Sequence, residues 1–222
     1  MIEGRNDFTA TDSTRYLVVL DVDSTLIENE AIELLAEEAG SLEIVAAVTE
    51  RAMRGELDFA ESLRERVATL AGLPSSVFDT VRSRITVTAG AEILIERIQE
   101  LGGTVGVVSG GFHELLDPLA QQLGLDKWKA NRLEVIDGVL TGNVLGHIID
   151  ADAKADALRQ WAEETSTPLS HTVAIGDGAN DLKMMEAAGL GIAFCAKPIV
   201  QESADVALNE RDLSKALGLI GL

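Results

Sequence analysis

The sequence has almost no cysteine, no long apolar run and few positive charges. Its one cysteine, Cys195, cannot form a disulfide within the chain. No apolar run approaches the roughly 20 residues that a membrane-spanning helix needs. Lysine and arginine number 18 against 37 aspartate and glutamate residues, so the formal net charge is -19. This excess of negative charge disfavours nucleic acid and anionic membranes as partners. We therefore expect a soluble, reduced, cytoplasmic protein.

The chain is long enough to bury a full hydrophobic core. It has 222 residues, of which 46% are apolar, so we expect one domain, or one domain with an insertion. Residues Met1 to Arg5 spell Met-Ile-Glu-Gly-Arg, which is typical of a protease site left by recombinant expression, although a natural start fits as well. We therefore treat residues 1–13 as a flexible terminus or such a remnant.

Two carboxylates follow the first strand that the sequence predicts. The apolar residues from Tyr16 to Leu20 are typical of a strand buried on both faces of a parallel sheet. Asp21 and Asp23 come next, at the edge where open α/β sheets bind ligands. Two acids so close repel each other, so one of them should face a cation or hold a proton. The alternative is that Asp21 merely starts a turn and Asp23 caps a helix.

A block of helices separates this strand from the next α/β unit. Helical spacing of apolar residues runs from residue 31 to about residue 87 without any strand pattern. Within it, Asp58 and Glu61 have the spacing of a capping box at a helix start. We expect residues 31–87 to form a small inserted helical cap over a core made of residues 14–30 and 88–222.

The third helix of this block carries an arginine on its apolar face. Arg66 lies nearly two helical turns after Phe59, so both side chains project from the same side, while Arg64 lies off it. A helical arginine usually reaches the solvent rim or pairs with a neighbouring glutamate, and this alternative stays open for Arg66. The apolar stripe itself consists of Phe59, Leu63, Val67 and Leu70.

Later strands also end in polar residues and glycines. They are Ser109, Gly110 and Gly111 after a strand over Thr104–Val108, and Asp177, Asn180 and Asp181 after a strand over Thr172–Ile175. A hydroxyl followed by two glycines offers an O–H and backbone N–H groups to an anion. A plain tight turn would explain the two glycines equally well.

Lys154 falls in the first turn of a helix that we expect from Ala153 to Trp161. Positive charge at a helix N-terminus is mildly unfavourable, so this lysine indicates an anion opposite it. Asp152 and Asp156 flank it and add negative charge. For a lone lysine a solvated surface position is the default, and both interpretations stay open.

The order of the elements predicts the fold class. Strands and helices alternate after the helical block, with further strands at residues 190–194 and 205–208 and a closing helix from Asp212. Asp137 and Gly138 lie between two apolar runs and predict an antiparallel hairpin. We expect an α/β fold, a doubly wound parallel sheet with the small helical cap inserted into it.

In such a sheet the polar strand ends converge along one edge. This would bring together Asp21, Asp23, Ser109, Asp177, Asp181 and Lys154. Oxygen ligands of this kind suit Mg²⁺, which typically takes one or two carboxylates plus a phosphate. A phosphate beside it would bind Ser109, backbone N–H groups and Lys154. The cluster therefore predicts metal-assisted phosphoryl transfer.

The motifs at these positions resemble those of the haloacid-dehalogenase-type phosphatases. The resemblance covers Tyr16 to Leu217 and is strongest to the members of the family that act on phosphoserine. The four motifs are Asp21-Val22-Asp23-Ser24-Thr25, Ser109-Gly110-Gly111, Lys154, and Gly176-Asp177-Gly178-Ala179-Asn180-Asp181. The closer match rests on Phe112 after the second motif, on Ala130-Asn131-Arg132, on Phe194-Cys195-Ala196-Lys197-Pro198, and on the segment Phe59 to Val67.

The resemblance implies roles for the residues at the sheet edge. Asp21 would be the nucleophile that forms an aspartyl-phosphate, and Asp23 the general acid and base. Mg²⁺ would be held by the Asp21 carboxylate, the Asp23 carbonyl and Asp177, with Asp181 beside them. The phosphate would bind Ser109, Gly110, Gly111, Lys154 and Asn180.

The resemblance also implies a head-group site in the cap. Glu30 would bind the amino group of the substrate and Arg66 its carboxylate, with Met53 and Phe59 as apolar closure. A guanidinium binds a carboxylate through two parallel hydrogen bonds, which fits the position of Arg66 on an apolar face.

The activity implied by the resemblance is Mg²⁺-dependent hydrolysis of O-phospho-L-serine to L-serine and phosphate. One alternative is a phosphatase or phosphotransferase for another small phosphomonoester, such as phosphohomoserine. Another is a phosphoprotein-binding or regulatory module without chemistry, against which the presence of both Asp21 and Asp23 argues. A transport ATPase, which shares the last motif, is excluded by the missing membrane spans and by the aspartate at position 23.

Overall fold

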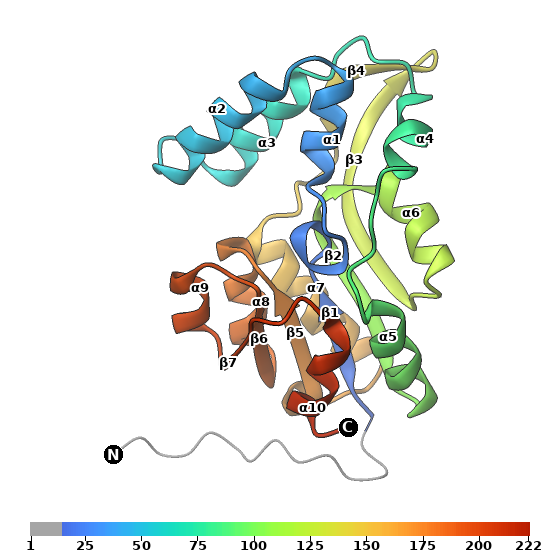
Figure 1. The fold of residues 1–222 in the computed structure, drawn as a ribbon, viewed down its shortest axis with the longest axis vertical. Helices are drawn as coiled ribbons and strands as arrows, with labels where there is room; N and C mark the ends of the chain where they lie inside the picture. Colours follow the sequence, from blue (N-terminus) through green and yellow to red (C-terminus); the bar gives the residue numbers. More distant parts are fainter. Residues whose placement is uncertain (1–14) are drawn as a thin grey trace.

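A seven-stranded sheet forms the centre of the computed structural model, which describes residues 15–222 (Figure 1). Its strand order is β4-β3-β2-β1-β5-β6-β7, and all neighbouring pairs are parallel except β3 with β4. This confirms the predicted doubly wound sheet; the prediction for residues 1–13 lies outside the described residues. The strands are β1 Leu17–Leu20, β2 Thr104–Phe112, β3 Lys127–Ile136, β4 Val139–Leu145, β5 Thr172–Gly176, β6 Leu190–Phe194 and β7 Val206–Leu208.

The central strand β1 is buried on both faces. Leu20 lies opposite Val107 of β2 and Ile175 of β5, so these three strands are in register at their carboxyl ends. The residues that follow Leu20 and Ile175, and the end of β2 around Ser109, therefore emerge at one edge of the sheet.

Helices cover the two faces of the sheet, and the side chains of β1 alternate between them. Val18 and Leu20 pack into the core under α5, α6 and α10, whereas Leu17 and Val19 pack into the core under α7, α8 and α9. The bounds are α5 Ala91–Glu100, α6 His113–Gln122, α7 Ala151–Glu164, α8 Leu182–Ala187, α9 Pro198–Ser203 and α10 Ala216–Ile220. No helix within residues 15–222 has the length and apolar character needed to span a bilayer.

Four α-helices lie between β1 and α5, as the sequence predicts: α1 Ala31–Glu38, α2 Leu42–Met53, α3 Phe59–Ala68 and α4 Val77–Arg82. The capping box of α3 is present, because Glu61 N donates to Asp58 Oδ1 at 2.7 Å and Asp58 N donates to Glu61 Oε2 at 3.0 Å. These helices share an apolar cluster with Leu133 and Leu140 of the β3–β4 hairpin, and Figure 1 shows this group of elements beyond the carboxyl edge of the sheet.

The hairpin has the turn that its sequence predicts, between strands β3 and β4. Asp137 and Gly138 have φ values of 51° and 78°, the left-handed conformation of a two-residue hairpin turn. β3 begins at Lys127 and pairs in parallel with β2 before it pairs with β4, and β2 itself continues through Gly110 and Gly111. Apolar and polar residues alternate too weakly over residues 127–132 to predict this part of β3 from the sequence.

Candidate active site

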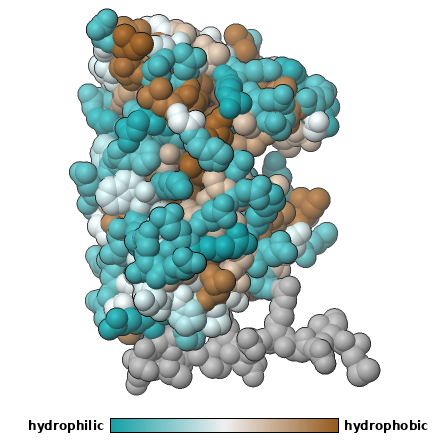
Figure 2. Space-filling model, turned by 180° about the vertical axis from the view of Figure 1, so that it is seen from behind, coloured by the Kyte–Doolittle hydropathy of each residue, from teal (hydrophilic) through white to brown (hydrophobic). Residues whose placement is uncertain are grey.

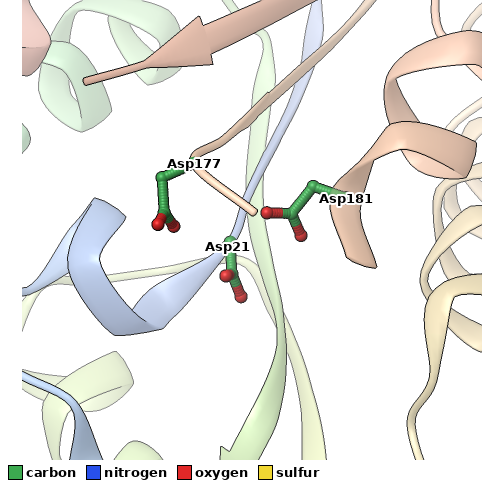
Figure 3. Close-up of side chains that lie close together, drawn as sticks. All are labelled: Asp21, Asp177 and Asp181. Atoms are coloured by element: carbon green, nitrogen blue, oxygen red, sulfur yellow. The ribbon is translucent and has the colours of Figure 1, made fainter. Parts of the chain in front are cut away.

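Three carboxylates meet at the carboxyl edge of the sheet (Figure 3). Asp21 follows β1, while Asp177 and Asp181 come from the turn between β5 and α8. Each offers an oxygen, and these oxygens lie within 4.8 Å of one another. A divalent cation can be held by such a set of hard oxygen ligands. The sequence predicted that Asp21 and Asp177 would be close, and the structure brings them together.

A buried lysine is bound to two of these carboxylates. Lys154 Nζ lies 2.6 Å from Asp21 Oδ1 and 2.7 Å from Asp181 Oδ1, and its side chain is 0% exposed. Burial alone would lower the pKa of Lys154, but Asp181 and Asp21 outweigh burial and raise it. The lysine is therefore charged, and the solvated position that is usual for a lone lysine is wrong here.

The negative residues that flank Lys154 in the sequence point away from the site. Asp152 pairs with Lys183 at 2.7 Å and Asp156 with Arg159 at 3.2 Å, and both aspartates are exposed. They therefore add little negative charge at the buried end of Lys154.

Asp177 and Asp21 both have raised pKa values. Burial, followed by the charge of Asp181, raises the pKa of Asp177 to about 6, while a hydrogen bond from Thr25 Oγ1 at 3.1 Å acts in the opposite direction. Burial also raises the pKa of Asp21 well above its ordinary value, with a further contribution from Asp181. Carboxylates that are costly to ionise in the metal-free protein gain most from a bound cation.

We expect the free-energy cost of ionising Asp177 to make the stability of the metal-free protein depend on pH. The folded pKa of Asp177, about 6, exceeds the ordinary value of 3.8. Its protonated form therefore favours folding, and this contribution is complete below pH 3.8 and lost as the pH rises through 6. Urea titrations with EDTA present measure the free energy of unfolding of the wild type and of Asp177→Asn. The wild-type value minus the variant value should fall by on the order of 2 kcal/mol as the pH rises through this range. A constant difference would contradict the assignment.

Asp23 lies between the sheet edge and the first helix. Its carboxylate accepts hydrogen bonds from Ala31 N at 2.7 Å and from Ser109 Oγ at 3.3 Å. Burial, and then the charge of Glu30, raise the pKa of Asp23 to about 7. A carboxyl group with such a pKa can give and take a proton near neutral pH.

The segment Ser109-Gly110-Gly111 fits closely against these groups. Gly111 N donates to Ser109 Oγ at 2.7 Å. A Cβ on Gly110 would lie 2.8 Å from Phe59, and one on Gly111 would lie 2.9 Å from Asp23 Oδ2. A side chain at either position would have to displace Phe59 or Asp23, so glycine suits both positions.

Asn131 holds this segment in place, a contact that our reading of the sequence missed. It is 1% exposed; its Nδ2 donates to Gly110 O at 2.8 Å, and its Oδ1 accepts from Ile149 N at 2.9 Å. Asn131 thereby connects the end of β2 to the loop that precedes α7. The only signal for it in the sequence was the resemblance of Ala130-Asn131-Arg132 to the family.

An open pocket lies between the carboxylates and the helices α1 and α3. Figure 2 shows the surface hollowed between the part of the molecule that contains the helices α1–α4 and the part below it. The residues that line it are Asp21, Asp23, Glu30, Ile32, Phe59, Leu63, Arg66, Gly110, Gly111, Phe112, Asp177, Gly178 and Asn180. Most of the residues predicted for the site are among them. Met53 is not: it is 68% exposed at the end of α2, so this structure does not bring it to the pocket.

Arg66 reaches the pocket from the apolar face of α3. Its Nε donates to Ser62 O at 3.2 Å, and burial lowers the pKa of Arg66 although Glu30 and Asp23 act in the opposite direction. Among residues 15–222 no carboxylate lies within ion-pair distance of Arg66. Its guanidinium is therefore available to an anionic ligand.

The parallel sheet and the aspartates at its carboxyl edge match one class of hydrolases. The family model of the haloacid dehalogenase-like hydrolases matches residues 18–186. The chain belongs to this family.

Several relatives of this chain are named phosphoserine phosphatases. The phosphoserine phosphatase of Streptococcus thermophilus is 55% identical over 204 residues, which is 92% of this chain and 95% of the relative. Phosphoserine phosphatase SerB2 of Mycobacterium tuberculosis is 52% identical over 97% of this chain, which spans 53% of that relative. Among solved structures, a substrate-bound phosphoserine phosphatase complex has a TM-score of 0.88 at 45% identity and covers 93% of this chain and 98% of its own. A phospho-aspartyl intermediate analogue of phosphoserine phosphatase has a TM-score of 0.87 at 46% identity, covering 93% and 99%.

Proposed function

We propose that this chain hydrolyses O-phospho-L-serine to L-serine and phosphate, a reaction of serine biosynthesis, through an aspartyl-phosphate. The observation that carries the proposal is the buried contact of Lys154 with Asp21, which itself lines a pocket together with Glu30 and Arg66. A fixed positive charge beside Asp21, and two oppositely charged side chains in the same pocket, support a nucleophilic role for Asp21 and an amino acid as the substrate. The names of the relatives support the same substrate.

In the first half of the reaction Asp21 acts as the nucleophile. One of its oxygens forms a bond to phosphorus, and the bond between phosphorus and the serine oxygen breaks. Asp23 gives its proton to that leaving oxygen, for which a pKa of about 7 is suited. Lys154 lies against Asp21 and stabilises the negative charge on the transferring phosphoryl group.

In the second half water replaces the aspartate on phosphorus. Asp23, now ionised, takes a proton from the attacking water, and the bond between Asp21 and phosphorus breaks. Phosphate leaves, and the two aspartates return to their starting states.

The donor set fits Mg²⁺. We propose that the Asp21 carboxylate, the Asp23 carbonyl and Asp177 hold the ion, while Asp181 keeps Lys154 and Gly178 N in place at 2.7 and 3.0 Å. When bound, the ion offsets the repulsion between the anionic phosphate and the carboxylates.

The remaining contacts of the phosphate come from two segments of the pocket. Gly110, Gly111 and Asn180 line the pocket and offer backbone N–H groups and a side-chain amide. Ser109 lies beside them and offers its hydroxyl, which contacts Asp23 in this structure. We propose that these groups bind the phosphate oxygens that Lys154 does not.

The helical block supplies the head-group site in this proposal. We propose that Glu30 binds the ammonium group and Arg66 the carboxylate of phosphoserine, with Phe59 against its methylene group. Residues 31–87 are the proposed cap and residues 14–30 with 88–222 the proposed core. Cytoplasmic location stays a prediction.

A phosphate-release assay on a panel of phosphorylated amino acids and sugars tests this function. With Mg²⁺ we expect phosphoserine to be the best substrate, and with excess EDTA we expect activity to fall at least about 100-fold and to return when Mg²⁺ is restored. Preference for phosphohomoserine or another phosphomonoester would replace the proposed substrate. Absence of any hydrolysis with Mg²⁺ would favour a binding module instead.

We expect Arg66→Ala to act on the substrate carboxylate alone. Loss of a charged hydrogen-bonded pair should lower kcat/KM for phosphoserine by about 10- to 100-fold. O-phosphoethanolamine, which keeps the amino group but lacks the carboxylate, should be affected far less. Arg64→Ala is the matched control, because Arg64 is exposed on the same helix. Equal losses on both substrates would contradict the assignment.

A further inference from the structure

Ser24 makes a hydrogen bond that none of the roles above uses. Its Oγ donates to Glu30 Oε1 at 2.6 Å. Glu30 lines the pocket and is itself exposed, so its long side chain has several rotamers open to it. The hydroxyl of Ser24 selects one of these rotamers, and a donor to a carboxylate forms a strong hydrogen bond.

The backbone of Ser24 is held in an unusual conformation. Its φ of 56° lies in the left-handed region, which residues other than glycine seldom adopt. Ser24 N donates to Asn29 O at 3.2 Å, and Ser24 O accepts from Arg211 Nη1 at 3.5 Å. Such strain persists where the surroundings fix it, and it concentrates at functional sites. Here the strained conformation aims the hydroxyl at Glu30.

The same turn connects the reacting groups to the head-group site. Asp23 Oδ1 accepts a hydrogen bond from Ala31 N at 2.7 Å, and the next residue, Ser24, binds Glu30. Two consecutive residues of the turn therefore bind two consecutive residues at the start of α1. This arrangement fixes the position of the Glu30 carboxylate relative to the Asp23 carboxyl group.

We propose that Ser24 is a positioning residue for substrate selection, whose hydroxyl holds the Glu30 carboxylate in place to receive an ammonium group. The proposal rests on the proposed function and deepens it. A carboxylate has acceptor capacity for both partners, so Oε2 of Glu30 stays available while Oε1 binds Ser24. Without the hydroxyl, binding of the ammonium group has to order the Glu30 side chain as well, which weakens it.

Two variants and two substrates test the proposal. Ser24→Ala and Ser24→Gly both remove the hydroxyl, and glycine also tolerates the left-handed backbone. The substrates are O-phospho-L-serine and the phosphate ester of 3-hydroxypropionate, which lacks only the amino group. In both variants we expect the ratio of kcat/KM for phosphoserine to kcat/KM for the second ester to fall about five- to tenfold, through KM for phosphoserine. An unchanged ratio, including an equal loss on both substrates, would overturn the proposal.

A double-mutant cycle separates positioning of Glu30 from other effects of the turn. Glu30→Gln should lower the ratio by itself, and Ser24→Gly in the Glu30→Gln background should lower it no further, because the two changes act through one contact. Two independent and additive losses would overturn the proposal.

Failure of the proposed function gives a different result. It would appear in the wild type, as turnover of the ester without the amino group but not of phosphoserine. The position of Glu30 in a crystal structure of Ser24→Gly then tests Ser24 independently of turnover. A Glu30 carboxylate that leaves its wild-type position supports the role of Ser24, and one that stays in place overturns it.

Discussion

Asp21→Asn is expected to abolish phosphoserine hydrolysis, by roughly 10,000-fold or more, while the protein stays folded. The amide cannot form the bond to phosphorus that the mechanism requires. Folding should suffer little, because Lys154 keeps its second partner Asp181 at 2.7 Å, and because burial and the charge of Asp181 make the ionised Asp21 costly in the metal-free protein and raise its pKa. Phosphate release with Mg²⁺ measures the first effect, and urea unfolding with EDTA measures the second.

Asp156→Asn is the control for this variant. Asp156 is exposed and pairs with Arg159 on the surface of α7, so its variant should keep nearly all of the activity. Substantial activity in Asp21→Asn would refute the nucleophile assignment. Loss of activity with loss of folded structure would instead show that Asp21 is needed for the fold.

Lys154→Ala should have the second largest effect, on both stability and activity. It leaves Asp21 and Asp181 buried without the ammonium group of Lys154, which lies 2.6 and 2.7 Å from them. Removing one partner of a buried ion pair typically costs about 3–5 kcal/mol. Urea unfolding should show a loss of this size, and phosphate release should fall at least about 100-fold because the phosphoryl charge is no longer stabilised.

Lys183→Ala is the matched control for Lys154→Ala, because it removes an exposed lysine in place of a buried one. Lys183 Nζ lies 2.7 Å from Asp152, the same distance as Lys154 from Asp181, but both partners are exposed. Water screens exposed ion pairs, so this variant should change the free energy of unfolding and the activity little. Equal losses in the two variants would contradict the role of burial. If Lys154→Ala does not fold, Lys154→Ala with Asp181→Asn removes one of the unpaired charges and should recover part of the stability.

The sequence was informative where structure depends on short-range chemistry. The apolar run that ends at Leu20 predicts the central strand, because a strand buried on both faces needs apolar residues throughout. Asp58 and Glu61 predict the start of α3, since both partners of a capping box lie within one turn. The carboxylates at strand ends predict the location of the site, because parallel strands bring their carboxyl ends to one edge.

Contacts between distant segments could not be predicted in the same way. Lys154 binds Asp21, which is 133 residues away, while the aspartates that flank it in the sequence face solvent. The link from Asn131 to Gly110 depends on the parallel pairing of β2 with the first half of β3, a strand that the local pattern does not reveal. The exposure of Met53 depends on how the end of α2 lies relative to the sheet, and no local spacing encodes that.

The most direct test of the account is to find the residue that carries the phosphoryl group during turnover. Wild-type protein is mixed with phosphoserine and Mg²⁺, quenched in acid, reduced with borohydride and digested for mass spectrometry. Reduction converts an aspartyl-phosphate to homoserine, and we predict homoserine at position 21 in the wild type and in Asp156→Asn. Modification of a different residue during turnover, with position 21 still aspartate, would contradict the account.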